Sequence, residues 1–399
     1  MTTHATRFDI STLAVHTGRE IPAGPGTPSS PPIYASSVFG FDTLEELDHV
    51  MAGDRAGYAY TRYGNPSHAL FEQAVADLES GEAARCTASG QAAVLASVLA
   101  VVTPGDRVVV ASDVYGGTYS LLANRLRPMG FDVTFCDPTR LDLVEEALAP
   151  GASALLAETI SNPLMRVADL EELAGITHSH GALLLVDNTF ATPFLARPLE
   201  LGADLVIHSA TKYLAGHDSS TAGVVSGRAE LIQKVASAAI ELGSTLGPID
   251  AWLVLFGLRT MALRVERQSS NAMALARALV EEPGVCKVHY PGLSTHPDHG
   301  IAAGLLRRGF GGMLSFELDG GWDAVSALVR ALDLVRLQPS LGGVWTTISH
   351  PASTSHRSIP EAQREAMGIS GGLVRVSCGI EAEQDIISDF RRALREIHR

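Results

Sequence analysis

The sequence is poor in cysteine and lacks a long apolar run. Its 399 residues include four cysteines, and Cys86, Cys136, Cys286 and Cys378 form no C-x-x-C pair. This scatter indicates neither a disulfide framework nor a zinc knuckle. The longest apolar stretch, residues 92–102, is far shorter than the roughly 20 residues that a membrane-spanning helix requires. We therefore expect a soluble protein of a reducing compartment, with no membrane partner.

The chain also has a shortage of positive charge. Its 30 Lys and Arg residues stand against 44 Asp and Glu residues, which gives a formal net charge of −14. A chain this acidic is a poor partner for nucleic acids and anionic membranes, so we expect neither. Residues 1–13 contain no apolar core of a signal peptide, which favours a cytoplasmic location.

Periodic segments begin only at residue 66. Residues 21–32 are so rich in proline and glycine that neither a regular helix nor a central strand is expected there. We therefore predict an N-terminal arm over residues 1–65, of a kind that often packs on a partner subunit. A large domain over residues 66–259 and a smaller C-terminal α/β domain over residues 260–399 complete the predicted organisation.

From residue 66 onward, apolar segments of strand length alternate with helical patterns. The predicted strands are 106–112, 130–135, 154–159, 182–187, 204–209 and 223–226, and helices are predicted to open near residues 66 and 88 and to cover 170–180. This alternation predicts an α/β fold with a mostly parallel sheet and helices on both faces. One long helix, from Pro248 to about Glu281, is predicted to lead into the C-terminal domain.

The most informative residue is Lys212, which follows the predicted strand 204–209 together with Ser209 and Thr211. A second apolar strand ends in Asp187. Pyridoxal phosphate requires these groups: an amine for a Schiff base, an acid for the ring nitrogen, and donors for the phosphate. In parallel sheets, ligands bind beyond the strand ends, where these residues are expected.

Other residues fit the same ligand. Ser89, Gly90 and Gln91 open a predicted helix, whose first amides and dipole favour a phosphate. Tyr115 follows a strand and is flanked by glycine, so it is placed to stack on a pyridine ring. Asn162 follows a strand end and can bond the ring hydroxyl.

Three more polar residues extend this set. Tyr60 and Arg62 are two residues apart, which places them on one face of an extended segment. Arg375 lies within a predicted strand, where a guanidinium requires a carboxylate as a bidentate partner. Taken alone, Arg375 is equally well explained by a structural salt bridge, whereas Lys212 taken alone is better explained as a surface or ion-paired lysine.

Two competing chemistries are disfavoured. His208, Ser209 and Asp187 imitate a hydrolase triad, but neighbouring residues of a strand point to opposite faces, so His208 is poorly placed to activate Ser209. The predicted site contains no metal. The histidine pairs 296/299 and 350/356 have no further ligands near them in sequence, and we expect them at the surface.

Taken together, these residues resemble the Cys/Met-metabolism family of pyridoxal-phosphate enzymes. The resemblance rests on Tyr-Thr-Arg-Tyr-Gly-Asn-Pro (60–66), Tyr-Gly-Gly-Thr (115–118), Val-Asp-Asn-Thr-Phe (186–190), Ser-Ala-Thr-Lys-Tyr (209–213) and Ser-Leu-Gly-Gly (340–343). It spans nearly the whole chain. It implies the fold-type-I transferase architecture, with pyridoxal 5'-phosphate as the cofactor.

The resemblance also implies a role for each residue. Lys212 binds the cofactor covalently and moves protons, Asp187 pairs with the ring nitrogen, and Tyr115 stacks on the ring and assists the leaving group. The other implied residues are Ser89, Gly90, Gln91, Ser209 and Thr211 at the phosphate, Tyr60 and Arg62 reaching it from the neighbouring subunit, and Asn162, Ser340 and Arg375 at the substrate, with Asn162 also on the cofactor. This arrangement makes the active unit a dimer, and the resemblance implies a homotetramer of two such dimers. Gln91 departs from the methionine common in the family.

Two positions bear on the substrate. Cystathionine-processing members carry glutamate before Ser-Leu-Gly-Gly, whereas this chain has Pro339, which offers no partner to a distal ammonium. Gly116 stands where methionine γ-lyases typically have cysteine, and Trp345 is a candidate cap for a small apolar pocket. We expect γ-elimination from L-methionine or a related sulfur amino acid. The alternatives are cystathionine γ-lyase and a γ-replacing transferase, either cystathionine γ-synthase or an O-acylhomoserine sulfhydrylase.

Overall fold

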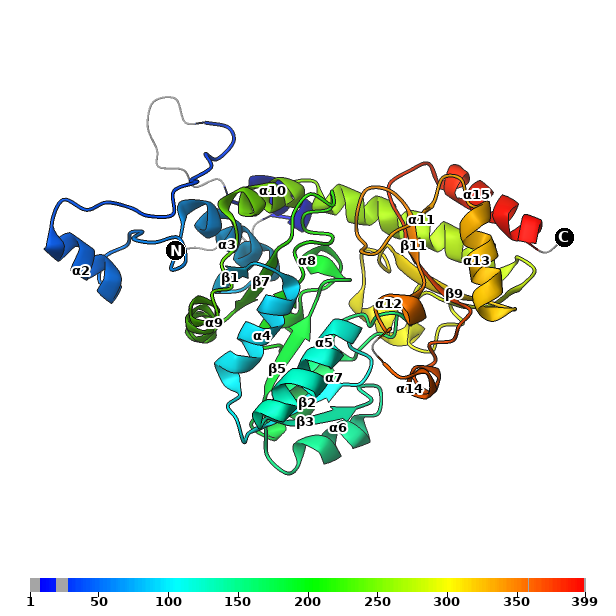
Figure 1. The fold of residues 1–399 in the computed structure, drawn as a ribbon, viewed down its shortest axis with the longest axis horizontal. Coiled ribbons are helices and arrows are strands. Elements are labelled where there is room, and N and C mark those ends of the chain that lie inside the picture. The colour runs from blue at the N-terminus through cyan, green and yellow to red at the C-terminus, as the bar shows by residue number, and fades with distance from the viewer. Residues whose placement is uncertain (1–7, 19–27, 358, 398–399) are drawn as a thin grey trace.

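The structure is a computed structural model that describes residues 8–18, 28–357 and 359–397. Most of the 21–32 segment therefore lies outside the described residues. Figure 1 shows a large sheet with its helices in blue to green, and a second sheet with α13 and α15 in yellow to red. Among the described residues, no helix combines the length and apolarity that crossing a membrane requires.

The large sheet confirms the predicted α/β architecture. Seven strands of the described chain lie in the order β1-β7-β6-β5-β4-β2-β3, and every neighbouring pair from β6 to β3 is parallel. Only β7 runs against its neighbours. The strands are β1 (Ala83–Thr87), β2 (Arg107–Ala111), β3 (Asp132–Cys136), β4 (Ala152–Glu158), β5 (Leu183–Asp187), β6 (Leu205–His208) and β7 (Gly223–Gly227). The pattern missed β1, because Ala-Ala-Arg-Cys-Thr contains little β-branched or aromatic character.

Helices cover both faces of this sheet, as predicted. In β7, Val225 belongs to the hydrophobic cluster that contains α4 and α9, whereas its neighbour Val224 belongs to the cluster that contains α3 and α10. Neighbouring strand residues point to opposite faces, so the two clusters lie on opposite sides of the sheet. The helices of this part are α3 (Pro66–Glu79), α4 (Gly90–Val101), α5 (Gly116–Leu121), α6 (Leu141–Leu148), α7 (Leu170–Ser179), α8 (Thr192–Leu195), α9 (Ala229–Glu241) and α10 (Pro248–Leu258), with short η segments at Leu122–Leu126, Arg127–Met129 and Pro198–Leu201.

Local capping explains where the helices next to the site begin. Asn65 caps α3 by accepting from the backbone N–H of Ser67, and Pro66 occupies the first helical turn. Ser89 caps α4 by accepting from the N–H of Ala92. Both starts agree with the sequence patterns.

The C-terminal part contains a second, smaller sheet. Its strands lie in the order β10-β11-β12-β9-β8 and span β8 (Val285–His289), β9 (Met313–Leu318), β10 (Arg336–Leu337), β11 (Thr347–Ser349) and β12 (Leu373–Ser377). The accompanying helices are α11 (Met261–Val280), α12 (His299–Leu305), α13 (Gly321–Ala331), α14 (Glu361–Ala366) and α15 (Glu383–Ile397), with an η turn at Pro351–Ser353. The domain boundaries proposed at residues 65 and 259 stay predictions.

The long helix predicted from Pro248 to Glu281 is wrong, because the chain forms two helices, α10 and α11. The buried guanidinium of Arg264 donates to the carbonyl oxygens of Gly257, Tyr213 and Leu214 at 2.7, 2.8 and 3.4 Å. Arg264 thus holds the end of α10 and the segment after Lys212 together. A capping interaction of this kind requires a tertiary contact, which the periodicity of one segment does not contain.

The N-terminal segment divides into two parts. Helix α1 (Ile10–His16) packs on α3 and α11, and its residues Ile10, Leu13 and Ala14 are buried. In contrast, α2 (Leu44–Ala52) buries no residue and lies at the end of an extension away from both sheets (Figure 1). Part of the predicted arm therefore belongs to the chain's own core, and the arm over residues 1–65 stays a prediction.

We expect Arg264→Ala to destabilise the protein without touching the candidate site directly. Three buried carbonyls lose their donor, which should lower the thermal midpoint by roughly 5 °C or more in a calorimetric scan. Arg277→Ala, which removes an exposed guanidinium from the same helix, is the control. Equal midpoints for the two variants would contradict this account of the α10–α11 joint.

Candidate active site

A cavity of about 530 Å³ lies beyond the carboxyl ends of β4, β5 and β6. It brings together every predicted site residue except Tyr60 and Arg62: Ser89, Gly90, Gln91, Tyr115, Asn162, Asp187, Ser209, Thr211, Lys212, Ser340 and Arg375. This position is the one expected for ligands of a parallel sheet. The cavity is therefore the candidate active site.

Lys212 projects into this cavity from the turn after β6. Its Nζ donates to the Ser340 hydroxyl at 2.7 Å. Burial and, to a lesser extent, the charge of Arg375 together lower the pKa of Lys212 from 10.5 to about 8, while Asp218 opposes the shift. A partly desolvated lysine of this kind is a nucleophile near neutral pH.

Asp187 ends β5 and lines the same cavity. Its Oδ1 accepts from the backbone N–H of Thr189 at 2.9 Å. Burial nevertheless raises the pKa of the Asp187 carboxyl, and no ion pair joins this carboxyl to a cation among the described residues. A protonated ring nitrogen is the kind of partner that this carboxylate requires.

The start of α4 forms a cradle with the segment after β6. A side chain at Gly90 would place its Cβ 2.6 Å from Ser209 Cβ, so only glycine permits this approach. The first amides of α4 consequently lie beside Ser209 and Thr211 at the positive end of the helix dipole. This is a suitable phosphate site.

Gly117, beside Tyr115, permits a close contact in the same way as Gly90. A Cβ at Gly117 would lie 2.4 Å from Tyr115 Cε1, so the ring rests against the start of α5. Tyr115 is exposed and lines the cavity, which leaves a ring face available for stacking.

Arg375 lies in the middle of β12 and is buried. Its guanidinium donates to Asn162 Oδ1 at 3.0 Å and to the carbonyl oxygen of Ser340 at 3.1 Å. Burial lowers the pKa of Arg375 to about 10. In the described part of the chain no carboxylate pairs with this guanidinium, which argues against a structural salt bridge and for a ligand carboxylate.

Ser340 is held in an unusual backbone conformation beside these groups. Its φ is 91°, in the region that favours glycine. Its carbonyl accepts from Arg375 and its hydroxyl accepts from Lys212. Strain of this sort persists where the surrounding contacts dictate it, as at functional sites.

Tyr60 and Arg62 do not reach the cavity of their own chain. Arg62 donates to the Ile240 carbonyl at 3.1 Å, and Tyr60 is exposed. The predicted extended conformation is wrong, because the N–H groups of Tyr63 and Gly64 close a turn on the Tyr60 carbonyl. A role at a neighbouring subunit's site stays a prediction.

Sequence reasoning missed several residues of the cavity wall: Val94, Thr118, Glu158, Ile160, Thr189, Phe190, Thr221, Leu341, Thr354 and Ser355. Glu158 had a signal, since a carboxylate at the end of an apolar strand resembles Asp187 in position. Thr354 and Ser355 had none, because they come from a loop of the C-terminal part. Trp345, predicted as a cap, is absent from the wall.

The structure also shows what His208, a member of the disfavoured hydrolase triad, contacts in place of Ser209. His208 Nε2 lies 2.6 Å from Glu79 Oε1, and both side chains are buried away from the cavity. The expectation of surface histidines is wrong for His296, His350 and His356, which are buried. No group of three potential metal ligands occurs among residues 8–18, 28–357 and 359–397.

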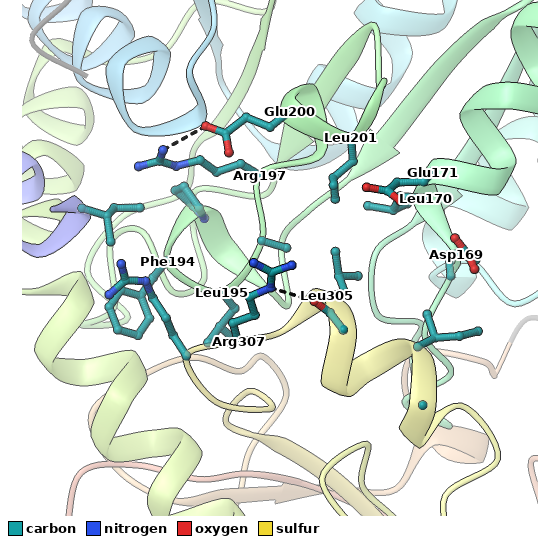
Figure 2. Close-up of a pocket in the computed structure, with 18 of the residues that line it drawn as sticks. Asp169, Leu170, Glu171, Phe194, Leu195, Arg197, Glu200, Leu201, Leu305 and Arg307 are labelled. Atoms are coloured by element: carbon teal, nitrogen blue, oxygen red, sulfur yellow. Dashed lines mark hydrogen bonds and ion pairs between the residues drawn. The ribbon is translucent and has the colours of Figure 1, made fainter. Parts of the chain in front are cut away.

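A second cavity, of about 700 Å³, lies between α7, α8 and α12 (Figure 2). Two ion pairs lie in its wall, Arg197 with Glu200 at 3.0 Å and Arg308 with Asp9 at 2.7 Å. It contains none of the predicted site residues and no buried, unpaired ionisable group. We therefore assign the chemistry to the cavity around Lys212.

The chain has clear relatives. The family model described as "Cys/Met metabolism PLP-dependent enzyme" matches residues 11–395. An L-methionine γ-lyase of Fusobacterium nucleatum subsp. polymorphum is 41% identical, over 98% of this chain and 99% of the relative. A cystathionine β-lyase of Lactococcus lactis subsp. cremoris is 42% identical, over 96% and 98%. A crystal structure of cystathionine γ-synthase from Xanthomonas oryzae pv. oryzae aligns with a TM-score of 0.92 at 41% identity, over 98% and 99%.

The chain therefore belongs to the Cys/Met-metabolism family of pyridoxal-phosphate-dependent enzymes. The predicted fold, family and cofactor are confirmed. The cavity fits this cofactor, because it combines a lysine of lowered pKa, a carboxylate without a cation, and a glycine cradle beside two hydroxyl residues.

The lowered pKa of Lys212 predicts how covalent attachment of the cofactor depends on pH. Only the neutral amine attacks an aldehyde, and in the folded chain it predominates above pH about 8 rather than above 10.5. The attachment rate of cofactor-free protein should therefore rise through pH about 8 and then level off, as followed by visible absorbance. Asp218→Asn should move the midpoint lower, since Asp218 raises this pKa. A wild-type midpoint near 10.5 would contradict the assignment.

Proposed function

We propose that this enzyme catalyses γ-elimination on L-methionine or a closely related sulfur amino acid, releasing a thiol, 2-oxobutanoate and ammonia. The observation that carries the proposal is one cavity with a buried, unneutralised Arg375 and a neutral Pro339. The first suits an α-carboxylate, and the second suits an uncharged thioether. The 41% sequence identity to an L-methionine γ-lyase supports the proposal, and a relative at 42% identity bears the name cystathionine β-lyase.

Arg375 and Asn162 are the proposed anchors of the substrate. The guanidinium presents a planar fork, and Asn162 Oδ1 and the Ser340 carbonyl fix its orientation at 3.0 and 3.1 Å. A carboxylate bound there restores the charge balance of a buried cation. The amino acid is thereby oriented before any bond breaks.

Lys212 is the proposed proton carrier. A pKa of about 8 lets its amine accept and release a proton near neutral pH, which is the condition for general acid–base catalysis. When bound, pyridoxal phosphate supplies an electron sink that acidifies the substrate's carbon-bound protons. The Ser340 hydroxyl holds the Lys212 amine in place, and we propose that the Tyr115 phenol assists departure of the γ-thiolate.

The other proposed assignments follow the cavity. Asp187 is proposed to pair with the ring nitrogen, Ser89, Gly90, Gln91, Ser209 and Thr211 to hold the phosphate, and Asn162 also to contact the ring. For Tyr60 and Arg62 we propose a place in the phosphate site of a neighbouring subunit, which requires an active dimer. We propose that two such dimers form a homotetramer. The exposed apolar residues of the arm, Val38, Leu44 and Met51, support such contacts.

All described cysteines are free, which supports a cytoplasmic location.

The second candidate function is γ-replacement or cystathionine cleavage, and one position favours it. A Cβ at Gly116 would lie 2.1 Å from the Ser355 carbonyl oxygen. The cysteine expected at this position in methionine γ-lyases would therefore require the 354–356 segment to move. This wall differs from that of the typical methionine γ-lyase.

A product assay tests the proposed function. Wild-type enzyme should form 2-oxobutanoate from methionine without an added thiol, and Lys212→Ala should abolish both turnover and the visible band of covalently bound cofactor. The comparison includes homocysteine, cystathionine and O-acyl homoserines with cysteine or sulfide. Faster turnover of cystathionine than of methionine, or a replacement product alone, rules out the methionine assignment.

Pro339→Glu should change the choice of substrate. The new carboxylate can pair with a distal ammonium, and we expect the ratio of kcat/KM for cystathionine over methionine to rise by about tenfold. Leu337→Glu, on the exposed strand β10, adds the same charge without lining the cavity. An unchanged ratio in Pro339→Glu would show that this position does not meet the distal group.

A further inference from the structure

Two carboxyl groups stand side by side at the edge of the large sheet. Glu158 ends β4 and Asp187 ends β5, and these residues are direct partners in the parallel register. Both line the cavity with Lys212. The sheet therefore places a second carboxyl group in the site, and neither the resemblance nor the proposed reaction assigns a role to it.

The Glu158 carboxyl faces backbone N–H groups of two different loops. Its Oε1 accepts from the N–H of Tyr115 at 2.6 Å, in the loop after β2. The backbone N–H of Asn162, in the loop after its own strand, faces the same carboxyl and lowers its pKa. One side chain thus connects the residue proposed to stack on the ring with the residue proposed to contact ring and substrate.

The connection extends to the substrate anchor. Asn162 Oδ1 accepts from Arg375 at 3.0 Å, and Arg375 donates in turn to the Ser340 carbonyl. Tyr115 begins α5 without a side-chain cap of its own. The hydrogen bond from the Tyr115 N–H to Glu158 is therefore a side-chain restraint on the turn that carries the Tyr115 ring. Through Asn162, this restraint is connected to the hydrogen bonds around Arg375.

The charges around Glu158 are compatible with this restraint. Burial raises the pKa of Glu158 well above its ordinary value, and the neighbouring Asp187 and Asp113 raise it further, while the two N–H groups oppose the shift. The restraint does not depend on protonation, because a carboxyl oxygen of Glu158 accepts from the Tyr115 N–H in either state.

We infer that Glu158 is a positioning residue, which holds Tyr115 and Asn162 in the orientation that the cofactor ring and the substrate require. The inference rests on the proposed function for its kinetic consequence, but its structural consequence concerns cofactor binding alone. It assigns Glu158 no contact with the reacting atoms.

Three variants separate positioning from charge. Glu158→Ala removes the acceptor, Glu158→Gln keeps a neutral acceptor oxygen, and Glu158→Asp keeps the charge but shortens the reach by one methylene. Glu146→Ala, an exposed site on α6, is the control. Each variant is measured for pyridoxal phosphate affinity, for visible circular dichroism of the bound cofactor, and for kcat and KM per bound cofactor.

We expect Glu158→Ala to weaken pyridoxal phosphate binding by about tenfold and to reduce the visible dichroism. Its kcat/KM should fall by about 10- to 100-fold per bound cofactor, whereas a merely structural role would reduce only the folded fraction. Glu158→Gln should lose less than Glu158→Ala, and Glu158→Asp more than Glu158→Gln. If the alanine variant does not fold, the order of the Gln and Asp variants decides the question.

Two outcomes overturn the inference: a Glu158→Ala variant that matches Glu146→Ala in all three readouts, or a Glu158→Asp variant that matches wild type while Glu158→Gln does not. The second outcome would show that charge, rather than the restraint, matters. Failure of the proposed function looks different. The wild type would then form no 2-oxobutanoate from methionine, while the effects on affinity and dichroism would persist.

Discussion

The parallel register of β4, β5 and β6 is the constraint from which the site follows. Glu158 faces Asp187 across one pair of strands, and Asp187 faces Ile207 across the next. Strand ends in register bring Asp187 and the turn that carries Lys212 to the same edge. A slip by one residue in either pair would turn the functional side chains into the opposite hydrophobic cluster. The apolar interiors of these strands, buried on both faces, make such a slip costly.

The site contains buried ionisable side chains whose charges other described residues do not neutralise. Lys212 and Arg375 lie close enough for the charge of Arg375 to lower the pKa of Lys212, and Asp187 and Glu158 repel each other in the same way. Buried charges of this kind weaken the folded state until they find partners. Ligands that supply an anion to Arg375 and a cation to Asp187 should therefore stabilise the fold as they bind. The same unpaired charges therefore prepare the site for its ligands and lower its local stability while no ligand is bound.

Several loops around this common frame form the wall of the cavity. Pro339, Gly116 and Ser355 belong to three segments, and the contact between Gly116 and the Ser355 carbonyl shows that the segments shape one another. A substitution in one loop consequently changes the space available to the next. Relatives with about the same identity to this chain bear the names of a methionine γ-lyase and a cystathionine β-lyase, which agrees with a fixed frame and a variable wall.

The sequence alone determined six strands of the large sheet, β2 to β7, and its helices α3, α4 and α7, because buried parallel strands and capped helices leave strong local patterns. It also named most of the polar residues that line the cavity. It did not determine the break between α10 and α11, which depends on Arg264 reaching carbonyls far along the chain. Nor did it show the turn at Tyr60, the burial of His356, or the part that Glu158 has in the cavity. Each of these depends on which distant segments meet, and only the tertiary structure decides that, because a backbone donor or a neighbouring charge leaves no trace in local periodicity.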